Sequence, residues 1–181
     1  MKLGTAALCS LSLLAACAGN PAIKPFDQGT LPPEVQVPLG HKPALVLVGS
    51  GDVVYECHPT GAATGQYAWS FVRPEAKLLD TTGKQVGRYF GPPATWDYWA
   101  GSRVTGKPLK SAPAGEGNLP FQLVEAEPAI GNHDALRGTT YIQRVNIKGG
   151  GTPTKACGWM NMREAQTVKY QADYIFYRAA P

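Results

Sequence analysis

Apolar and polar residues alternate with a period of two over most of the chain after residue 44, a period typical of β-strands. The alternation is clearest over residues 141–148 and 168–177, where Arg144 and Asp173 fall on the more polar faces. Antiparallel sheets with one buried face give this pattern. It therefore predicts two long, half-buried strands near the C-terminal end.

Shorter strands are predicted before these two. Residues 44–48 form an unbroken apolar run, and the glycine-rich sequence at 49–52 is a turn signal before an alternating segment at 53–57. This order predicts a β-hairpin. The other predicted strands are residues 67–72, 77–81, 85–90 and 119–126, with a turn at 82–84 and with Pro120 marking a sheet edge.

No segment has a convincing helical period, and at most a turn or two is expected near residues 161–166. The chain also contains 21 glycines and 16 prolines, which mark many turns. Many short strands joined in this way are typical of sandwiches and barrels. We therefore expect residues 39–181 to form a single all-β domain, an antiparallel β-sandwich or a barrel-like structure with long Gly/Pro-rich loops.

The first residues have the pattern of an export signal. Lys2 precedes an apolar stretch over 3–14, which fits a signal core of ~7–15 residues and falls short of the ~20 needed to span a membrane. The stretch ends in Leu-Ala-Ala-Cys at 14–17, which resembles the bacterial lipobox. Residues 1–16 are thus expected to be a lipoprotein signal peptide, and Cys17 to carry lipid. The alternative is an ordinary secretory signal with an incidental Cys17.

Lipidation would make the membrane a partner of the domain, because buried acyl chains anchor a protein at about 0.8 kcal/mol per CH₂. Ala18 follows Cys17 where an aspartate would retain the protein at the inner membrane. By resemblance to lipoprotein sorting, this implies a lipid-anchored protein of the cell envelope at the outer membrane. Residues 17–38 contain five prolines and are expected to form a Pro-rich tether.

Two cysteines remain after the signal and the lipid site are set aside, Cys57 and Cys157. In an oxidising compartment such a pair predicts a disulfide. It would close a loop of about 100 residues, for which chain entropy alone predicts ~4–5 kcal/mol. A metal or redox pair is the weaker alternative, because there is no CxxC motif and no histidine at ligand spacing.

Charge and motifs exclude several classes of function. The chain has 17 basic and 13 acidic residues but no run of Lys or Arg, so no nucleic-acid partner is expected. His41, His58 and His133 lack the spacing of metal ligands, and no cofactor motif is present. We therefore expect neither a metal nor a cofactor.

Several stretches resemble an uncharacterised family of exported bacterial and fungal proteins, the domain of unknown function 3455. They are Val-Val-Tyr-Glu-Cys at 53–57, Thr-Tyr-Ile-Gln-Arg-Val-Asn at 140–146, Gly149-Gly150 with Cys157, Tyr-Gln-Ala-Asp-Tyr-Ile-Phe-Tyr at 170–177, Gly91-Pro92 with Thr95-Trp96, and Gly101-Ser102. The likeness runs from about Val37 to Tyr177 and implies a secreted domain without an established activity.

The chain departs from this family's pattern in two regions, with Arg-Tyr-Phe-Gly-Pro at 88–92 followed by an inserted Pro93-Ala94, and with Ala-Gly-Ser at 100–102. Arg88 stands where the family has the histidine of a His-Tyr-Ala-Gly-Pro sequence, and Ala100 stands where it has the aspartate of Asp-Gly-Ser. If that histidine and aspartate are catalytic in relatives, their chemistry is lost here.

Two candidate binding sites follow from the residues. Trp96, Asp97, Tyr98 and Trp99 lie in a predicted loop over 91–102, where aromatic rings could stack on a sugar or a lipid. The alternative is that Trp96 fills the core. Arg144 could clamp an anionic ligand in a pocket, or instead form a cross-strand pair with Asp173.

These observations favour a non-enzymatic envelope lipoprotein with a structural or binding role. The partner would be a glycan, a small ligand or another envelope protein. The alternative function is an envelope hydrolase whose dispersed His and Asp residues converge on Ser102, although Ser102 is not in a GxSxG elbow.

Overall fold

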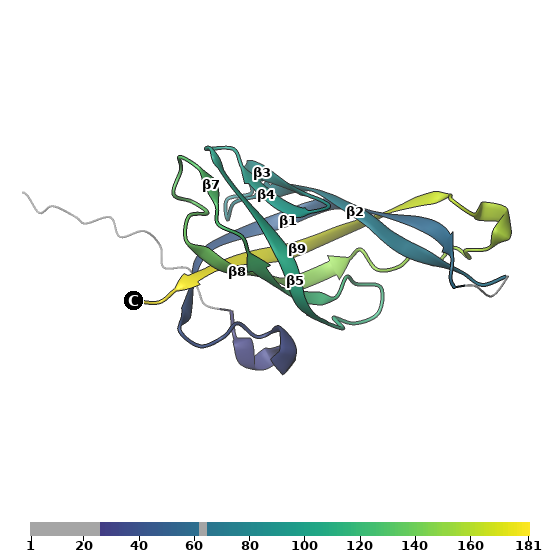
Figure 1. Cartoon of the computed structure of the whole chain (residues 1–181), viewed down its shortest axis with the longest axis horizontal. Coiled ribbons are helices and arrows are strands. Elements are labelled where there is room, and N and C mark those ends of the chain that lie inside the picture. Colours follow the sequence, from purple (N-terminus) through teal and green to yellow (C-terminus); the bar gives the residue numbers. More distant parts are fainter. Residues whose placement is uncertain (1–25, 62–64) are drawn as a thin grey trace, which may run out of the picture.

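The computed structural model describes residues 26–61 and 65–181, and this part of the chain has an all-β architecture (Figure 1). Its elements are three short 3₁₀ helices, η1 (Gln28–Thr30), η2 (Pro33–Val35) and η3 (Trp159–Asn161), and nine strands, β1 (His41–Pro59), β2 (Tyr67–Leu79), β3 (Gln85–Phe90), β4 (Ala94–Tyr98), β5 (Ser102–Ala112), β6 (Phe121–Ala126), β7 (Ile130–Gly131), β8 (Thr139–Gly149) and β9 (Ala165–Ala179). No helix in these ranges is long and apolar enough to cross a bilayer.

The strands form one antiparallel sheet in the order β4-β3-β2-β1-β9-β8-β6-β5-β7. Because β4 also pairs with β5, eight of the strands close into a ring, and β7 pairs with the start of β5. Closure leaves few free strand edges. The prediction of an all-β antiparallel domain is confirmed.

The predicted hairpin turn at 49–52 is wrong, because β1 runs without interruption for 19 residues. A Cβ on Gly49 would lie 2.4 Å from the Tyr174 ring, and one on Gly51 would lie 2.1 Å from the Glu75 carbonyl oxygen. These glycines therefore allow neighbouring groups to approach the middle of a strand. The segments predicted separately at 67–72 and 77–81 likewise belong to one strand, β2.

The predicted loop over 91–102 is also wrong, since residues 94–98 form β4 and β5 begins at Ser102. Only the short turn at 91–93 separates β3 from β4. No strand was predicted over 102–112, where Gly106 and Pro108 suggest a loop. Pro108 is accommodated next to a register shift between β5 and β6.

The two C-terminal strands are confirmed and extend beyond their predicted ends. In β8 the pairing with β9 shifts between Val145 and Lys148, where Asn146 has a φ of 49°. Both faces of β8 before this bulge are buried: Ile142 and Gln143 are each 0% exposed. The polar face predicted for this strand is therefore absent around Arg144.

One hydrophobic core fills the inside of the ring and a second lies on its outer face. The inner core includes Leu47, Trp96 and Phe176. The outer core is formed by residues of β5, β6, β8 and β9 and is covered by the segment from Phe26 to Val37. Leu31 and Val35 of this segment are buried, and Gln143 Nε2 donates to the Val35 carbonyl oxygen at 2.6 Å.

This packing changes the interpretation of the Pro-rich segment. A tether was expected over residues 17–38, but its second half, from Phe26, is part of the folded unit. The 3₁₀ helices η1 and η2, drawn in purple in Figure 1, lie against the sheet here. The remainder of the expected tether, with Cys17 and the expected signal peptide, lies outside the described residues.

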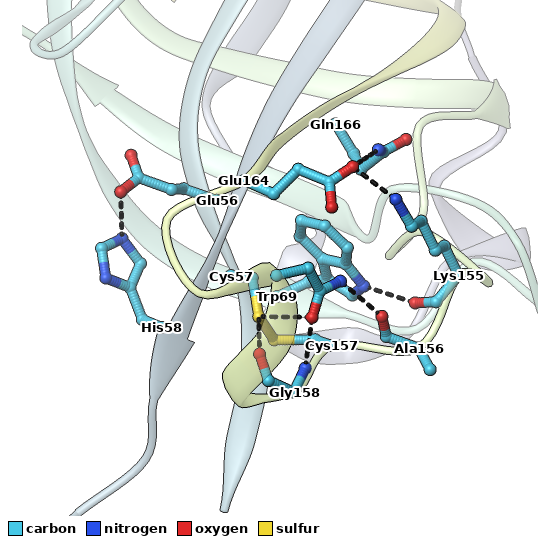
Figure 2. Close-up of a disulfide and its surroundings, with 11 residues drawn as sticks. Glu56, Cys57, His58, Trp69, Lys155, Ala156, Cys157, Gly158, Glu164 and Gln166 are labelled. Atoms are coloured by element: carbon cyan, nitrogen blue, oxygen red, sulfur yellow. Dashed lines mark hydrogen bonds and ion pairs between the residues drawn. A yellow bond between two sulfur atoms is a disulfide. The ribbon is translucent and has the colours of Figure 1, made fainter.

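The predicted disulfide is confirmed: Cys57 is bonded to Cys157, with the two Cα atoms 5.6 Å apart and a separation of 100 positions in sequence. Figure 2 shows that it joins the end of β1 to the loop that carries η3. Trp69 Nε1 donates to the Lys155 carbonyl oxygen at 2.7 Å, and Asn161 Nδ2 donates to that of Ala156 at 2.7 Å. The loop is thus held at the end of the molecule away from the C-terminus (Figure 1).

Candidate functional site

The structure does not gather the predicted aromatic residues into one surface. Trp96 is 1% exposed and stacks on Tyr89 inside the ring, with ring centroids 4.7 Å apart. Tyr98 is half-buried and lies beside His133, whereas Trp99 is 58% exposed. Trp96 therefore fills the core, which was the alternative expected from the sequence. The aromatic rings do not form a common surface on which a sugar could stack.

Asp97 has structural partners on the outside of the ring. Its carboxylate accepts hydrogen bonds from Arg88 of β3 at 3.2 Å and from Arg103 of β5 at 3.1 Å. Partial burial raises the pKa of Asp97, but these two guanidinium groups outweigh burial and hold the pKa below its usual value. Asp97 thus links three strands and is not a free polar group for a ligand.

The residues proposed for a hydrolase do not form a nucleophile–base pair. Ser102 is buried, and its Oγ accepts a hydrogen bond from the Leu136 amide at 3.3 Å. The nearby His133 accepts from the Ala135 amide through Nδ1. Within residues 26–61 and 65–181, no histidine or carboxylate is hydrogen-bonded to Ser102 Oγ. The arrangement therefore offers no activated serine.

Arg144 is buried, although a polar face was predicted for its strand. It is only 5% exposed, lies opposite Tyr174 of β9, and donates from Nε and Nη2 to the Pro120 carbonyl oxygen at 3.1 and 2.9 Å. The cross-strand pair with Asp173 is not formed, because Asp173 lies opposite Val145 and accepts from Asn146 instead. Arg144 is the one charged side chain in the buried part of the described residues.

No carboxylate compensates this charge. None of the ion pairs among the described residues involves Arg144. The charge of Arg144 lowers the pKa of four nearby tyrosines, Tyr55, Tyr89, Tyr170 and Tyr174. Burial raises the pKa of all four, and the positive charge of Arg144 offsets only part of this effect. They are neutral at physiological pH, so the guanidinium is buried without a counter-ion.

Arg144 lines a pocket of about 540 Å³ at the mouth of the ring. This volume lies within the usual range for small-ligand sites. Three aromatic side chains contribute to the lining, with Tyr55 and Tyr89 buried and Phe71 51% exposed. Five prolines from four separate segments also line the pocket: Pro74, Pro92, Pro93, Pro108 and Pro120. Besides Arg144 and the two tyrosine hydroxyls, the polar side chains of the lining are those of Gln122 and Lys107.

Four other hollows of similar volume lie on the described surface. None of them includes a buried charged side chain. The pocket at Arg144 is therefore the candidate site. Sequence reasoning named Arg144 but missed the rest of the lining, because its prolines suggest only turns and its tyrosines suggest only strand cores. The strongest available signal was that Arg144 lies within the family-like stretch 140–146.

Comparison with known proteins gives one match. The model of a family described as a protein of unknown function, DUF3455, matches residues 38–178. No curated protein and no solved structure matches the chain. The matched range includes the ring, the disulfide and the lining of the pocket.

Proposed function

Because the chain belongs to the DUF3455 family, whose description states no activity, we propose a function from its pocket: it is an envelope lipoprotein that binds a small, mainly apolar ligand at the mouth of the ring. The observation that carries this proposal is a hollow of about 540 Å³ with an aromatic and proline lining and one buried charge. Small-molecule sites typically combine an apolar wall with a few well-placed polar groups.

The surroundings of the pocket favour binding over catalysis. Its walls come from β1, β2, β3, β5, β6, β8 and the turn between β3 and β4, and the closed ring holds these strands in place. A lining fixed before the ligand arrives reduces the entropy lost on binding. Among the described lining residues there is no histidine, serine, cysteine or carboxylate to act as nucleophile or general base.

The N-terminal sequence supports the location in the envelope. The Leu-Ala-Ala-Cys sequence at 14–17 would place lipid on Cys17, nine residues before Phe26, the first residue that the structure describes. Nine residues span at most about 30 Å when fully extended. The ring would therefore stay close to the membrane that holds the lipid. The disulfide fits an oxidising compartment such as the periplasm or the cell surface.

A neutral apolar dye tests the binding function. We expect N-phenyl-1-naphthylamine to bind the mature chain and to gain fluorescence, with Cys17→Ser used so that no acyl chain competes. Gln122→Trp places a large side chain in the lining and should weaken dye binding at least tenfold. Gln171→Trp, on an exposed position of β9, is the matched control and should bind as the wild type does.

Thermal melting of both variants shows whether they are folded at the assay temperature. If folded Gln122→Trp binds the dye as strongly as the wild type does, the dye binds outside this pocket. If the wild type binds neither the dye nor another apolar ligand titrated directly by calorimetry, the proposed function itself is overturned.

A further inference from the structure

We propose that the pocket selects apolar molecules that carry a single carboxylate, and that Arg144 is the residue that binds this carboxylate. The ligand class is then a monocarboxylic acid with a hydrocarbon or aromatic body. The inference rests on the proposed binding function and names the chemistry of its ligand.

The guanidinium of Arg144 has unused hydrogen-bonding capacity. An arginine side chain carries five N–H donors. The hydrogen bonds among the described residues use Nε and Nη2, and both go to the single carbonyl oxygen of Pro120. Burial raises the pKa of Tyr174, and a contact of its hydroxyl with the Arg144 guanidinium opposes this rise. Besides that contact, the hydrogen bonds of Arg144 do not use Nη1, and Arg144 forms part of the pocket lining. The Pro120 carbonyl thus fixes the side chain from one side and leaves donors for a ligand.

The charge of the site matches one negative charge. Arg144 has no acidic partner, and the tyrosines around it are neutral because burial raises their pKa. The only other cation of the lining, Lys107, is paired with Glu127 at 2.7 Å. A monoanion would neutralise Arg144, whereas a dianion would leave one buried charge uncompensated.

The shape of the donor group favours a carboxylate. The planar guanidinium presents parallel N–H donors that fit the two oxygens of a carboxylate. A buried charge without a partner is costly for the empty protein. Binding of a carboxylate would remove this cost, so the acidic group would contribute more here than on the protein surface.

The remaining lining determines the other part of the ligand. Tyr55, Phe71 and Tyr89 offer apolar and aromatic surface, and the prolines between them have no N–H groups to donate. A glycan would bury several hydroxyls, and besides Arg144 and the two tyrosine hydroxyls the lining offers them only the polar side chains of Gln122 and Lys107. Unpaired buried hydroxyls are unfavourable, so a sugar fits this pocket poorly.

Two ligands that differ only in the head group test the inference. Decanoate and decanol should be titrated against the dye-loaded mature chain with Cys17→Ser at pH 7.5, below the concentration at which either ligand aggregates. We expect decanoate to displace the dye at a concentration at least tenfold lower than decanol does. Decyl phosphate, a dianion at this pH, should be weaker than decanoate.

Substitutions then assign the preference to Arg144. Arg144→Met should remove the advantage of decanoate over decanol. Arg103→Met removes an arginine from the outer face of β5, where it pairs with Asp97, and should keep the wild-type preference. If Arg144→Met does not fold, Arg144→Gln keeps a donor for the Pro120 carbonyl without the charge. The comparison of head groups in the wild type needs no variant.

The outcomes separate the two proposals. Equal displacement by decanoate and decanol, or stronger displacement by decyl phosphate, would overturn the inference about the acid and leave the apolar pocket standing. The dye could also bind in a way that Gln122→Trp blocks while neither decanoate nor decanol displaces it. This result would overturn the proposed ligand class but not the binding pocket. If the wild type binds no dye, and neither ligand binds when titrated directly by calorimetry, both proposals fail.

Discussion

Five polar or charged side chains are buried in the described part of the chain, and they differ in how they are satisfied. Thr95, Ser102 and Gln143 have hydrogen-bond partners within the fold. Thr139 Oγ1 has none there, and Arg144 alone carries a charge. Burial of an unpaired polar group costs ~1–3 kcal/mol and that of a charge costs more. Arg144 is thus the buried side chain whose position the fold explains least.

Trp96 and Trp99 are close in sequence, but they should contribute very differently to the stability of the domain. Trp96 is 1% exposed and contacts Tyr89, Tyr174 and Phe176. Trp96→Ala should therefore lower the free energy of unfolding by about 3–5 kcal/mol. Trp99 is 58% exposed, and Trp99→Ala should change it by no more than about 0.5 kcal/mol. Urea denaturation measures both values, and equal losses would show that the burial of these rings is assigned incorrectly.

Strand β1 depends on two glycines in its middle. A Cβ on Gly51 would lie 2.1 Å from the Glu75 carbonyl oxygen and 2.5 Å from the Ala76 Cα, and both are backbone atoms of the paired strand β2. Backbone atoms of a paired strand cannot move aside as the end of a flexible side chain can. The length of the strand therefore depends on the absence of a side chain here.

Gly51→Ala should destabilise the domain by about 3 kcal/mol because the two strands must separate locally. Ser50→Ala, on the same strand, is the control and should have little effect, since Ser50 is partly exposed and its hydroxyl has no hydrogen bond within the described residues. Urea denaturation again gives the difference. A wild-type midpoint for Gly51→Ala would contradict this close approach of β1 and β2.

A strand could be predicted from the sequence where its alternation of apolar and polar residues is not interrupted by glycine or proline. Strands β8 and β9 were found because nothing breaks their period over 141–148 and 168–177. Strand β1 was divided at Gly49 because glycine suggests a turn, and the close packing that requires it involves Tyr174, far away in sequence. β4 and β5 were missed since prolines and glycines surround them.

The candidate site could be predicted only in part, for a related reason. Arg144 was named, but its strand was assigned one polar face, and the segment from Phe26 to Val37 that buries the opposite face had the composition of a spacer. The pocket needs side chains from β1, β2, β3 and β5 together. A pattern that is local in sequence does not contain this arrangement.

At the scale of the whole molecule, three features tie distant parts of the chain together. The ring closes between β4 and β5, the disulfide joins residues 57 and 157, and the segment from Phe26 packs on the outer face of β6, β8 and β9. The proposed lipid anchor precedes this last segment by nine residues. Anchor and ring would therefore act as a compact unit at the membrane.

Metabolic labelling tests the proposed anchor. The wild-type chain should incorporate a labelled fatty acid and fractionate with the outer membrane, because acylated Cys17 would hold it there. Cys17→Ser should lose the label and be recovered as a soluble or uncleaved form. Cys57→Ser, which removes a different cysteine, should keep the label. A wild-type protein that takes up no fatty acid would refute the lipoprotein assignment.

The central claim is that the mouth of the ring holds an apolar carboxylic acid against Arg144. A crystal structure of the mature chain with decanoate tests it most directly. The account predicts the carboxylate within hydrogen-bonding distance of the Arg144 guanidinium, with the alkyl chain between Tyr55, Phe71 and Tyr89. A pocket that stays empty at saturating decanoate, or a carboxylate bound away from Arg144, would contradict it.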